Sequence, residues 1–231
     1  MSVWVKKNPL TLILIIFSLL TSQLSYAGGI VVGRTRVIYD ENKREASLSV
    51  KNNSESNPFL IQSWVDAGGE KTRGPFIITP PLFRLNAQQE SNLRISYNGK
   101  SLPADRESVF YINVKAIPST PKNTKNELKL VVNTRIKLFY RPTSLSGKAF
   151  EAPKSLTFTR NNGHLIIKNP SPYHVVFSSL SIGPTFLKEV AMIAPLSELD
   201  VVLPANTSGS SVKWDAINDY GGTTEPYEQP L

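Results

Sequence analysis

Glu127-Leu-Lys-Leu-Val-Val-Asn-Thr-Arg-Ile-Lys-Leu-Phe-Tyr-Arg141 is a long strand-like run near the middle of the chain. Apolar and polar side chains alternate along it, as they do on the two faces of a β-strand. One face carries Leu128, Leu130, Val132, Thr134, Ile136 and Leu138, and the other carries Lys129, Val131, Asn133, Arg135, Lys137 and Phe139. The run predicts a strand over residues 128–140, which is about 13 residues long, whereas most strands have five or six.

These residues alone leave two interpretations of the run open. In the first, it is an ordinary amphipathic strand whose apolar face lies in the core of its own domain. In the second, it is an exposed edge strand, which is an aggregation hazard unless it serves to pair with a partner. Both interpretations predict a sheet protein.

Shorter strand-like runs, separated by turn residues, continue on both sides. They span residues 30–39, 46–51, 59–65, 92–97 and 109–115 before it, and 156–159, 164–168, 173–182, 199–203 and 211–217 after it. No helix is predicted, because the best candidate, residues 187–193, is short and stops before Pro195. The pattern therefore predicts an all-β fold.

Residues 142–147, which contain Pro, Ser and Gly, are typical of a linker. The chain that follows a leader is long enough for one large or two small domains. We expect two β-sandwiches joined by a short hinge, one over residues 28–142 and one over residues 143–231.

Residues 1–27 have the three parts of a secretory signal peptide. Lys6 and Lys7 precede an apolar run over residues 10–20. Ser25-Tyr-Ala27 follows with the small-x-small pattern of a cleavage site. The alternative is an uncleaved membrane anchor, but the run is about half of the ~20 residues that a spanning helix needs. No other segment is apolar enough to span a membrane, so we expect an exported chain without a membrane span after cleavage.

The composition argues against several classes of function. The chain has no cysteine, which removes thiol catalysis and thiolate metal sites, and its two histidines, His164 and His174, lie in separate strand-like runs. We therefore expect no cofactor and no metal site. The net charge is +8, but the basic residues are scattered, which favours an anionic protein partner over nucleic acid. Neither a Gly-x-Ser-x-Gly elbow nor a nucleophile–base pair is evident, so a hydrolase, or any other enzyme, is not expected.

Several local sequences resemble one family, the periplasmic pilus chaperones of the chaperone–usher pathway, or PapD-like family. They are Gly33-Arg-Thr-Arg-Val-Ile-Tyr39, Thr79-Pro-Pro-Leu-Phe-Arg-Leu85, Leu102-Pro-Ala-Asp-Arg-Glu-Ser-Val-Phe-Tyr111, Arg135-Ile-Lys-Leu-Phe-Tyr-Arg-Pro142, Asn169-Pro-Ser-Pro-Tyr173 and Ile217-Asn-Asp-Tyr-Gly-Gly222. The resemblance covers essentially the whole chain after the leader.

The resemblance implies two immunoglobulin-like β-sandwich domains, set at an angle with a cleft between them. It also implies a function in the periplasm of a Gram-negative cell. Such a chaperone captures pilus (fimbrial) subunits whose sandwich lacks its last strand, lends its own strand to fill the groove, and delivers the subunit to an outer-membrane usher.

The resemblance also assigns roles to particular residues. Leu128, Leu130 and Val132 would be the donor strand. Arg36 and Lys137, which by themselves are typical of solvated surface charges, would bind the terminal carboxylate of the subunit, a suitable acceptor for charge-assisted hydrogen bonds. Glu107, Arg141 and Asp219 would form a salt-bridge network between the domains.

The chain departs from the family pattern after Leu85, where Asn86-Ala-Gln-Gln-Glu90 stands in place of a Pro-Gly turn. The fairly short loop from Ile117 to Asn126 and the lack of cysteine resemble the short-loop branch of the family. A structural pilus subunit or adhesin is the alternative function, but residues 28–33 are too short for the N-terminal extension of a pilin. Whether the free protein covers its own strand by dimerising is left open.

Overall fold

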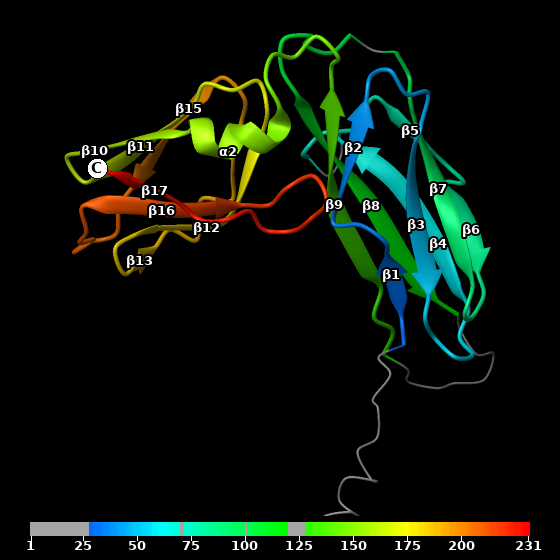
Figure 1. Ribbon diagram of the computed structural model, residues 1–231. Coiled ribbons are helices and arrows are strands. Elements are labelled where there is room, and N and C mark those ends of the chain that lie inside the picture. Colours follow the sequence, from blue (N-terminus) through cyan, green and yellow to red (C-terminus); the bar gives the residue numbers. More distant parts are fainter. Residues whose placement is uncertain (1–27, 70–71, 100, 120–127) are drawn as a thin grey trace, which may run out of the picture.

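The computed structural model describes residues 28–69, 72–99, 101–119 and 128–231; the expected signal peptide lies outside the described residues. Strands dominate it, and they form two sandwiches that lie side by side (Figure 1). The expectation of an all-β protein with two immunoglobulin-like sandwiches is confirmed.

The first sandwich consists of a four-stranded and a five-stranded sheet, with strand orders β1-β3-β7-β5 and β2-β9-β8-β4-β6. Its strands are β1 (Ile30–Val32), β2 (Arg36–Asp40), β3 (Ala46–Asn52), β4 (Phe59–Asp66), β5 (Phe76–Thr79), β6 (Leu82–Leu85), β7 (Glu90–Tyr97), β8 (Ser108–Pro118) and β9 (Val132–Arg141). Alternate side chains of both sheets meet in a core that includes Leu48, Leu93, Ile112 and Leu138, all fully buried.

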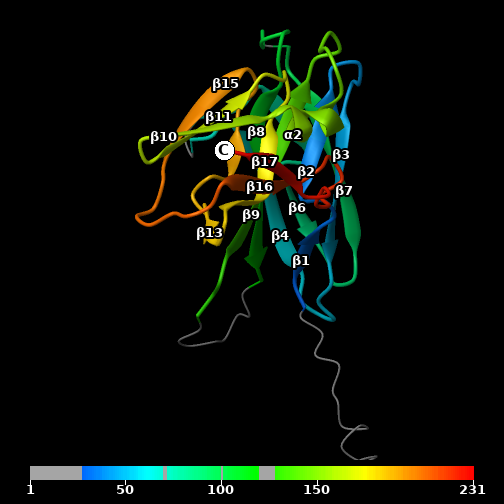
Figure 2. The same ribbon diagram turned by 60° about the vertical axis from the view of Figure 1, so that its left-hand side comes forward.

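The second sandwich packs the sheet β10-β11-β15 against the sheet β13-β12-β16-β17, with β14 paired to β12 (Figure 2). Its strands are β10 (Thr157–Asn161), β11 (His164–Asn169), β12 (Val175–Ile182), β13 (Thr185–Phe186), β14 (Met192–Ile193), β15 (Ser197–Val202), β16 (Ser211–Ala216) and β17 (Tyr227–Pro230). Its core is separate from the first one, and the predicted boundary at 142–143 falls between Tyr140 of the first core and Ala152 of the second.

A short helical segment opens the second sandwich, where the sequence predicts no helix. It consists of the 3-10 turn η1 (Ala149–Glu151) and the α-helical turn α2 (Ala152–Ser155), with Pro153 at a position that tolerates proline. The indole Nε1 of Trp214 donates a hydrogen bond of 2.9 Å to the Pro153 carbonyl. This tertiary bond fixes a segment that is too short to be stable as a helix by itself.

The run predicted as one strand over residues 30–39 is two strands, because the chain changes sheets at Gly33. β1 pairs with β3 in the smaller sheet, whereas β2 pairs in parallel with β9 in the larger one. A Cβ atom on Gly33 would clash with the Ser49 hydroxyl, at 2.2 Å from Oγ, so a larger residue at the crossing would require the Ser49 side chain to rotate.

The same Asn-x-Ser motif ends one strand in each sandwich, β3 in the first and β11 in the second. Asn169 is buried; its amide donates to the carbonyls of Tyr173 and Ala194 at 2.8 and 2.9 Å, and its carbonyl accepts from the Ser171 backbone and hydroxyl. Asn52 and Ser54 repeat this arrangement in the first sandwich. Each asparagine thus satisfies the polar backbone groups of a buried turn.

We expect Asn169→Ala to lower the free energy of unfolding of the second sandwich by about 2–3 kcal/mol, because it leaves buried backbone groups without a hydrogen-bond partner. Asn161→Ala, at the exposed end of β10 and without a positive φ, is the control and is expected to cost less than half as much. Urea unfolding followed by Trp214 fluorescence measures both. Equal effects would show that the buried amide is not needed for the turn.

Candidate functional site

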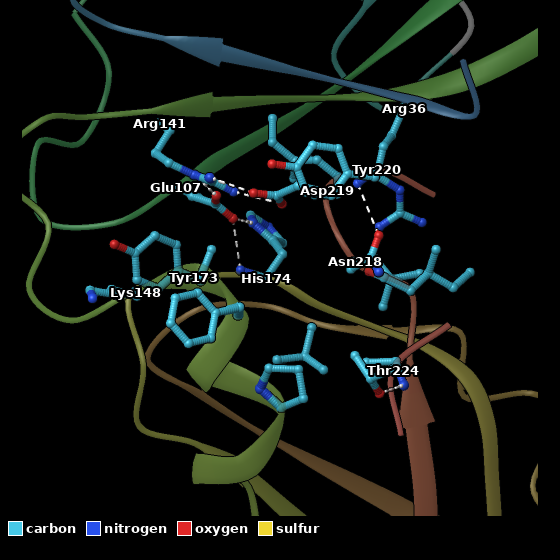
Figure 3. Close-up of a pocket in the computed structure, with 18 of the residues that line it drawn as sticks. Arg36, Glu107, Arg141, Lys148, Tyr173, His174, Asn218, Asp219, Tyr220 and Thr224 are labelled. Carbon is cyan, nitrogen blue, oxygen red and sulfur yellow. Dashed lines mark hydrogen bonds and ion pairs between the residues drawn. The ribbon is translucent and has the colours of Figure 1, made fainter. Parts of the chain in front are cut away.

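A cleft of about 510 Å³ lies between the two sandwiches (Figure 3). The first sandwich contributes Arg36, Phe139 and Arg141 to its walls, and the second contributes residues from β12 and from the loop after β16. That loop reaches across to β2 in Figure 1, where the Ile217 carbonyl accepts a hydrogen bond from Arg36.

Arg36 and Lys137 lie side by side because β2 and β9 pair in parallel and in register at these two residues. Lys137 lies on the face of β9 opposite the core residues Ile136 and Leu138, as the alternation in the sequence predicts. The parallel pairing, which joins distant parts of the chain, could not be derived from either strand alone.

The Arg36 guanidinium is almost completely buried but only partly satisfied. Its Nη1 donates to the Ile217 carbonyl at 2.8 Å, while its Nε is buried without a partner in the described residues. Burial lowers the pKa of Arg36 and the charge of Asp219 opposes that shift. A buried cation with an unused donor is poised to accept an anion.

Lys137 is half-buried beside it. Desolvation lowers the pKa of Lys137 below its ordinary value, and the charges of Arg36 and Arg135 lower it further. No acid in the described part of the chain forms an ion pair with Lys137. Two neighbouring cations without a direct counter-ion can together hold a carboxylate.

The structure brings together Glu107, Arg141 and Asp219. Arg141 donates from Nε to Glu107 at 2.7 Å, and from Nη1 and Nη2 to the two carboxylate oxygens of Asp219 at 2.7 and 3.0 Å. Burial lowers the pKa of Arg141, but the bonds and charges of the two acids outweigh it and raise the pKa above its ordinary value. Since Asp219 lies in the second sandwich and the other two in the first, this triad ties the domains together.

Sequence reasoning missed the other polar contacts around the triad. The second oxygen of Glu107 accepts from the His174 backbone at 2.9 Å and lies 3.4 Å from His174 Nδ1. The Tyr173 ring lies under the Arg141 guanidinium. Both residues follow the Asn169-Pro-Ser-Pro motif, which the sequence marked only as part of the resemblance.

Arg135 is a further residue that the sequence did not assign. Its guanidinium bonds to buried Asp66 at 2.6 Å and stacks on the Tyr111 ring, 3.7 Å from the centroid. Burial acts to raise the pKa of Asp66, but hydrogen bonds from Arg135, Asn113 and Gly68 lower it below the ordinary value. Arg135 is thus neutralised locally, unlike Lys137 two residues further along the same face.

The segment before β9 is exposed and apolar. Leu128, Leu130 and Val132 have exposed fractions of 86, 73 and 60%. The predicted strand over residues 128–140 is therefore too long at its start, because β9 begins at Val132 and residues 128–131 form no strand. β2 pairs only with residues 137–141, so the described strands leave the edge of β9 from Val132 to Ile136 open.

Neither a metal-binding cluster nor a membrane-spanning helix is present among the residues that the structure describes. No group of three or more His, Cys, Asp or Glu side chains is arranged to hold a metal ion. No helix there is long and apolar enough to cross a membrane.

The fold and cleft define a two-domain β-sandwich protein with a cationic recess beside an open strand edge. Family comparison is more specific: residues 29–146 match the N-terminal domain of the pili and flagellar-assembly chaperone PapD, and residues 151–228 match the C-terminal domain of the pili assembly chaperone PapD. The chain therefore belongs to the PapD-like pilus assembly chaperone family. This membership favours a chaperone over the alternative of a structural pilus subunit.

Individual relatives agree. The probable fimbrial chaperone LpfB of Escherichia coli O157:H7 is 46% identical over 213 residues, 90% of this chain and 91% of LpfB. The Salmonella enterica SafB chaperone, solved in complex with the SafA pilin, is similar with a TM-score of 0.81 at 31% identity, over 90% of this chain and 98% of that one. The periplasmic chaperone SfaE has a TM-score of 0.75 at 36% identity, over 88% and 100%.

We expect Lys137→Met to stabilise the free protein at neutral pH by about 0.5–2 kcal/mol, because it removes a desolvated charge beside another cation. A lowered pKa means that the unfolded chain holds this proton more tightly, so the wild-type free energy of unfolding rises with pH as the folded lysine deprotonates. The advantage of Lys137→Met should therefore shrink towards about pH 10. Urea unfolding at both pH values measures it.

Lys168→Met is the control, since the Lys168 ammonium lies 2.9 Å from Glu198 on an exposed strand surface. We expect no gain there. If both variants stabilise the protein equally, the destabilisation attributed to the desolvated Lys137 charge beside Arg36 is wrong.

We expect Asp219→Asn to loosen the arrangement of the two sandwiches while changing the unfolding midpoint little. The carboxylate that binds Arg141 through two hydrogen bonds is part-exposed, so its net contribution to stability is small. Small-angle X-ray scattering should show a broader distribution of dimensions than for the matched surface variant Glu198→Gln. An unchanged scattering profile would contradict a role for the triad in fixing the domains.

Proposed function

We propose that this protein captures pilus subunits by lending them its own strand, and that Arg36 and Lys137 hold the subunit's C-terminal carboxylate. One observation supports this most strongly: the segment from Leu128 to Val132, which leads into β9, is exposed and apolar, and β9 carries an unpaired lysine further along. The strand-lending segment and the anion site therefore lie on one continuous stretch of chain.

Leu128, Leu130 and Val132 are the proposed donor residues. In an extended conformation their side chains point to one side and enter a groove in the subunit, while backbone groups pair across the edge. Burial of each aliphatic side chain contributes roughly 1.5–3 kcal/mol. The same burial removes an edge that would otherwise promote aggregation.

The position of β2 supports a direction for the subunit strand. A strand that pairs with residues 128–136 of this chain occupies the line that β2 continues, and β2 starts at Arg36. For the subunit's carboxylate to meet Arg36 and Lys137, its last strand must run parallel to β9. The anchored end then fixes the register, since a slip of one residue would turn every side chain to the other face.

The proposal has further parts that rest on the sequence and on relatives. Residues 1–27 direct export and are removed, the protein acts in the periplasm of a Gram-negative cell, and it delivers subunits to an outer-membrane usher. The domains are 28–142 and 143–231, with the Glu107–Arg141–Asp219 triad holding their angle. The role is binding without catalysis and without a cofactor; pairing of two free copies would cover the same strand.

The test is co-purification from periplasm with the subunit encoded beside this gene. Arg36→Ala and Lys137→Ala are each expected to reduce recovered subunit by more than tenfold, because loss of one partner of a buried charge pair costs about 2–5 kcal/mol. Leu130→Ser should reduce it as well. Val202→Ser is the matched control, since Val202 and Leu130 are 72 and 73% exposed.

Normal subunit recovery by both Arg36→Ala and Lys137→Ala would refute the anchor. A loss with Val202→Ser equal to that with Leu130→Ser would refute the donor strand. Circular dichroism of each purified variant checks that it is folded.

A further inference from the structure

The cleft continues beyond the two cations into space that a carboxylate alone does not fill. Arg36 lines the cavity, whereas Lys137, its neighbour on β9, is not among the lining residues. Phe139 of β9 and Pro153 of the second sandwich also line it, and Figure 3 shows Arg36, Lys148 and Tyr220 among its walls. At about 510 Å³ it is large enough for a whole side chain.

The surfaces of this cavity are chemically mixed. Val176 and Ile217 give it an apolar wall, and Phe139 faces them from the first sandwich. Two further aromatic side chains line it while remaining largely in solvent, Phe150 at 67% and Tyr220 at 98% exposed. Aromatic rings exposed around a recess are typical of a binding site rather than of an ordinary surface.

The charges of the cavity are not balanced. Arg141 is already paired with Glu107 and Asp219. Lys148, whose Nζ lies 5.6 Å from the centre of the Phe150 ring, forms no ion pair in the described residues. Together with Arg36 it leaves the cavity cationic, so a basic side chain is repelled there whereas an aromatic or neutral one is accepted.

We propose that this cavity is a subsite for the side chain of the subunit's C-terminal residue, with a preference for an aromatic side chain and against a basic one. The inference rests on the proposed anchor. Because Arg36 lines the cavity and Lys137 is its neighbour in the sheet, a carboxylate held by both lies next to the cavity. The terminal side chain, which leaves the same Cα as the carboxylate, then reaches inward. Phe150, Tyr220 and Lys148 are then the residues that determine specificity.

The test uses synthetic peptides that copy the last strand of the pilus subunit encoded beside this gene and end in Phe, Gln, Gly or Lys. Each is made as the free acid and as the amide, and binding to the mature full chain is measured by calorimetry. Among the acids, Phe should bind about tenfold more tightly than Gly, which is the usual scale for filling an apolar pocket. Lys should bind more weakly than Gly, and every amide should bind more weakly than its acid.

Tyr220→Ala and Phe150→Ala should reduce the ratio of Phe to Gly affinity towards one and leave the acid-to-amide ratio unchanged. Phe186→Ala is the matched control, because Phe186 is 63% exposed on the same sandwich and does not line the cavity. Lys148→Ala should restore binding of the peptide that ends in Lys.

If acids bind more tightly than amides but the four terminal residues bind alike, the subsite is refuted and the anchor stands. If acids and amides bind alike, the anchor is refuted, and the subsite with it. A Phe preference that survives both aromatic substitutions would likewise overturn the assignment.

Discussion

The parallel pairing of β2 with only the second half of β9 is the constraint on which the rest of the site depends. It places Arg36 beside Lys137 and leaves the first half of β9 without a neighbour on that side. The pairing is short because the chain crosses between sheets at Gly33, so that the residues before it pair with β3 instead of β9. The crossing therefore leaves the first half of β9 without a neighbour from its own chain.

The second sandwich supplies contacts that hold Arg36 and Arg141 of the first sandwich in place. The Ile217 carbonyl fixes one nitrogen of Arg36, and Asp219, two residues further on, shares Arg141 with Glu107. The loop that carries both residues is compact: Asn218 accepts from the backbones of Tyr220 and Gly222, and a Cβ on Gly221 would collide with Thr35. The orientation of the buried guanidinium thus depends on how the two domains meet.

The alternation of side chains was sufficient to predict the sheet class, most strands and the face on which Lys137 lies. It could not predict where strands stop, because that depends on partners: residues 128–131 have the right pattern but no strand beside them. The short helix at Ala152 depends on a tertiary bond from Trp214. The Glu107–Arg141–Asp219 contact came only from resemblance, since no local rule joins residues so far apart. The repeated Asn-x-Ser motif, in contrast, is a local pattern that can be found in the sequence alone.

The open edge of β9 has a definite length, because β2 blocks one end of it at Arg36. The position of the last residue of a strand that pairs there therefore fixes which of its other residues lie beside the open edge. A chain that carries extra residues after that point collides with β2, and one that is cut short leaves its apolar side chains out of step with Leu128 and Leu130. Under the proposed function the site acts as a ruler, which accepts polypeptides that end at the correct place and discriminates against incomplete or extended ones.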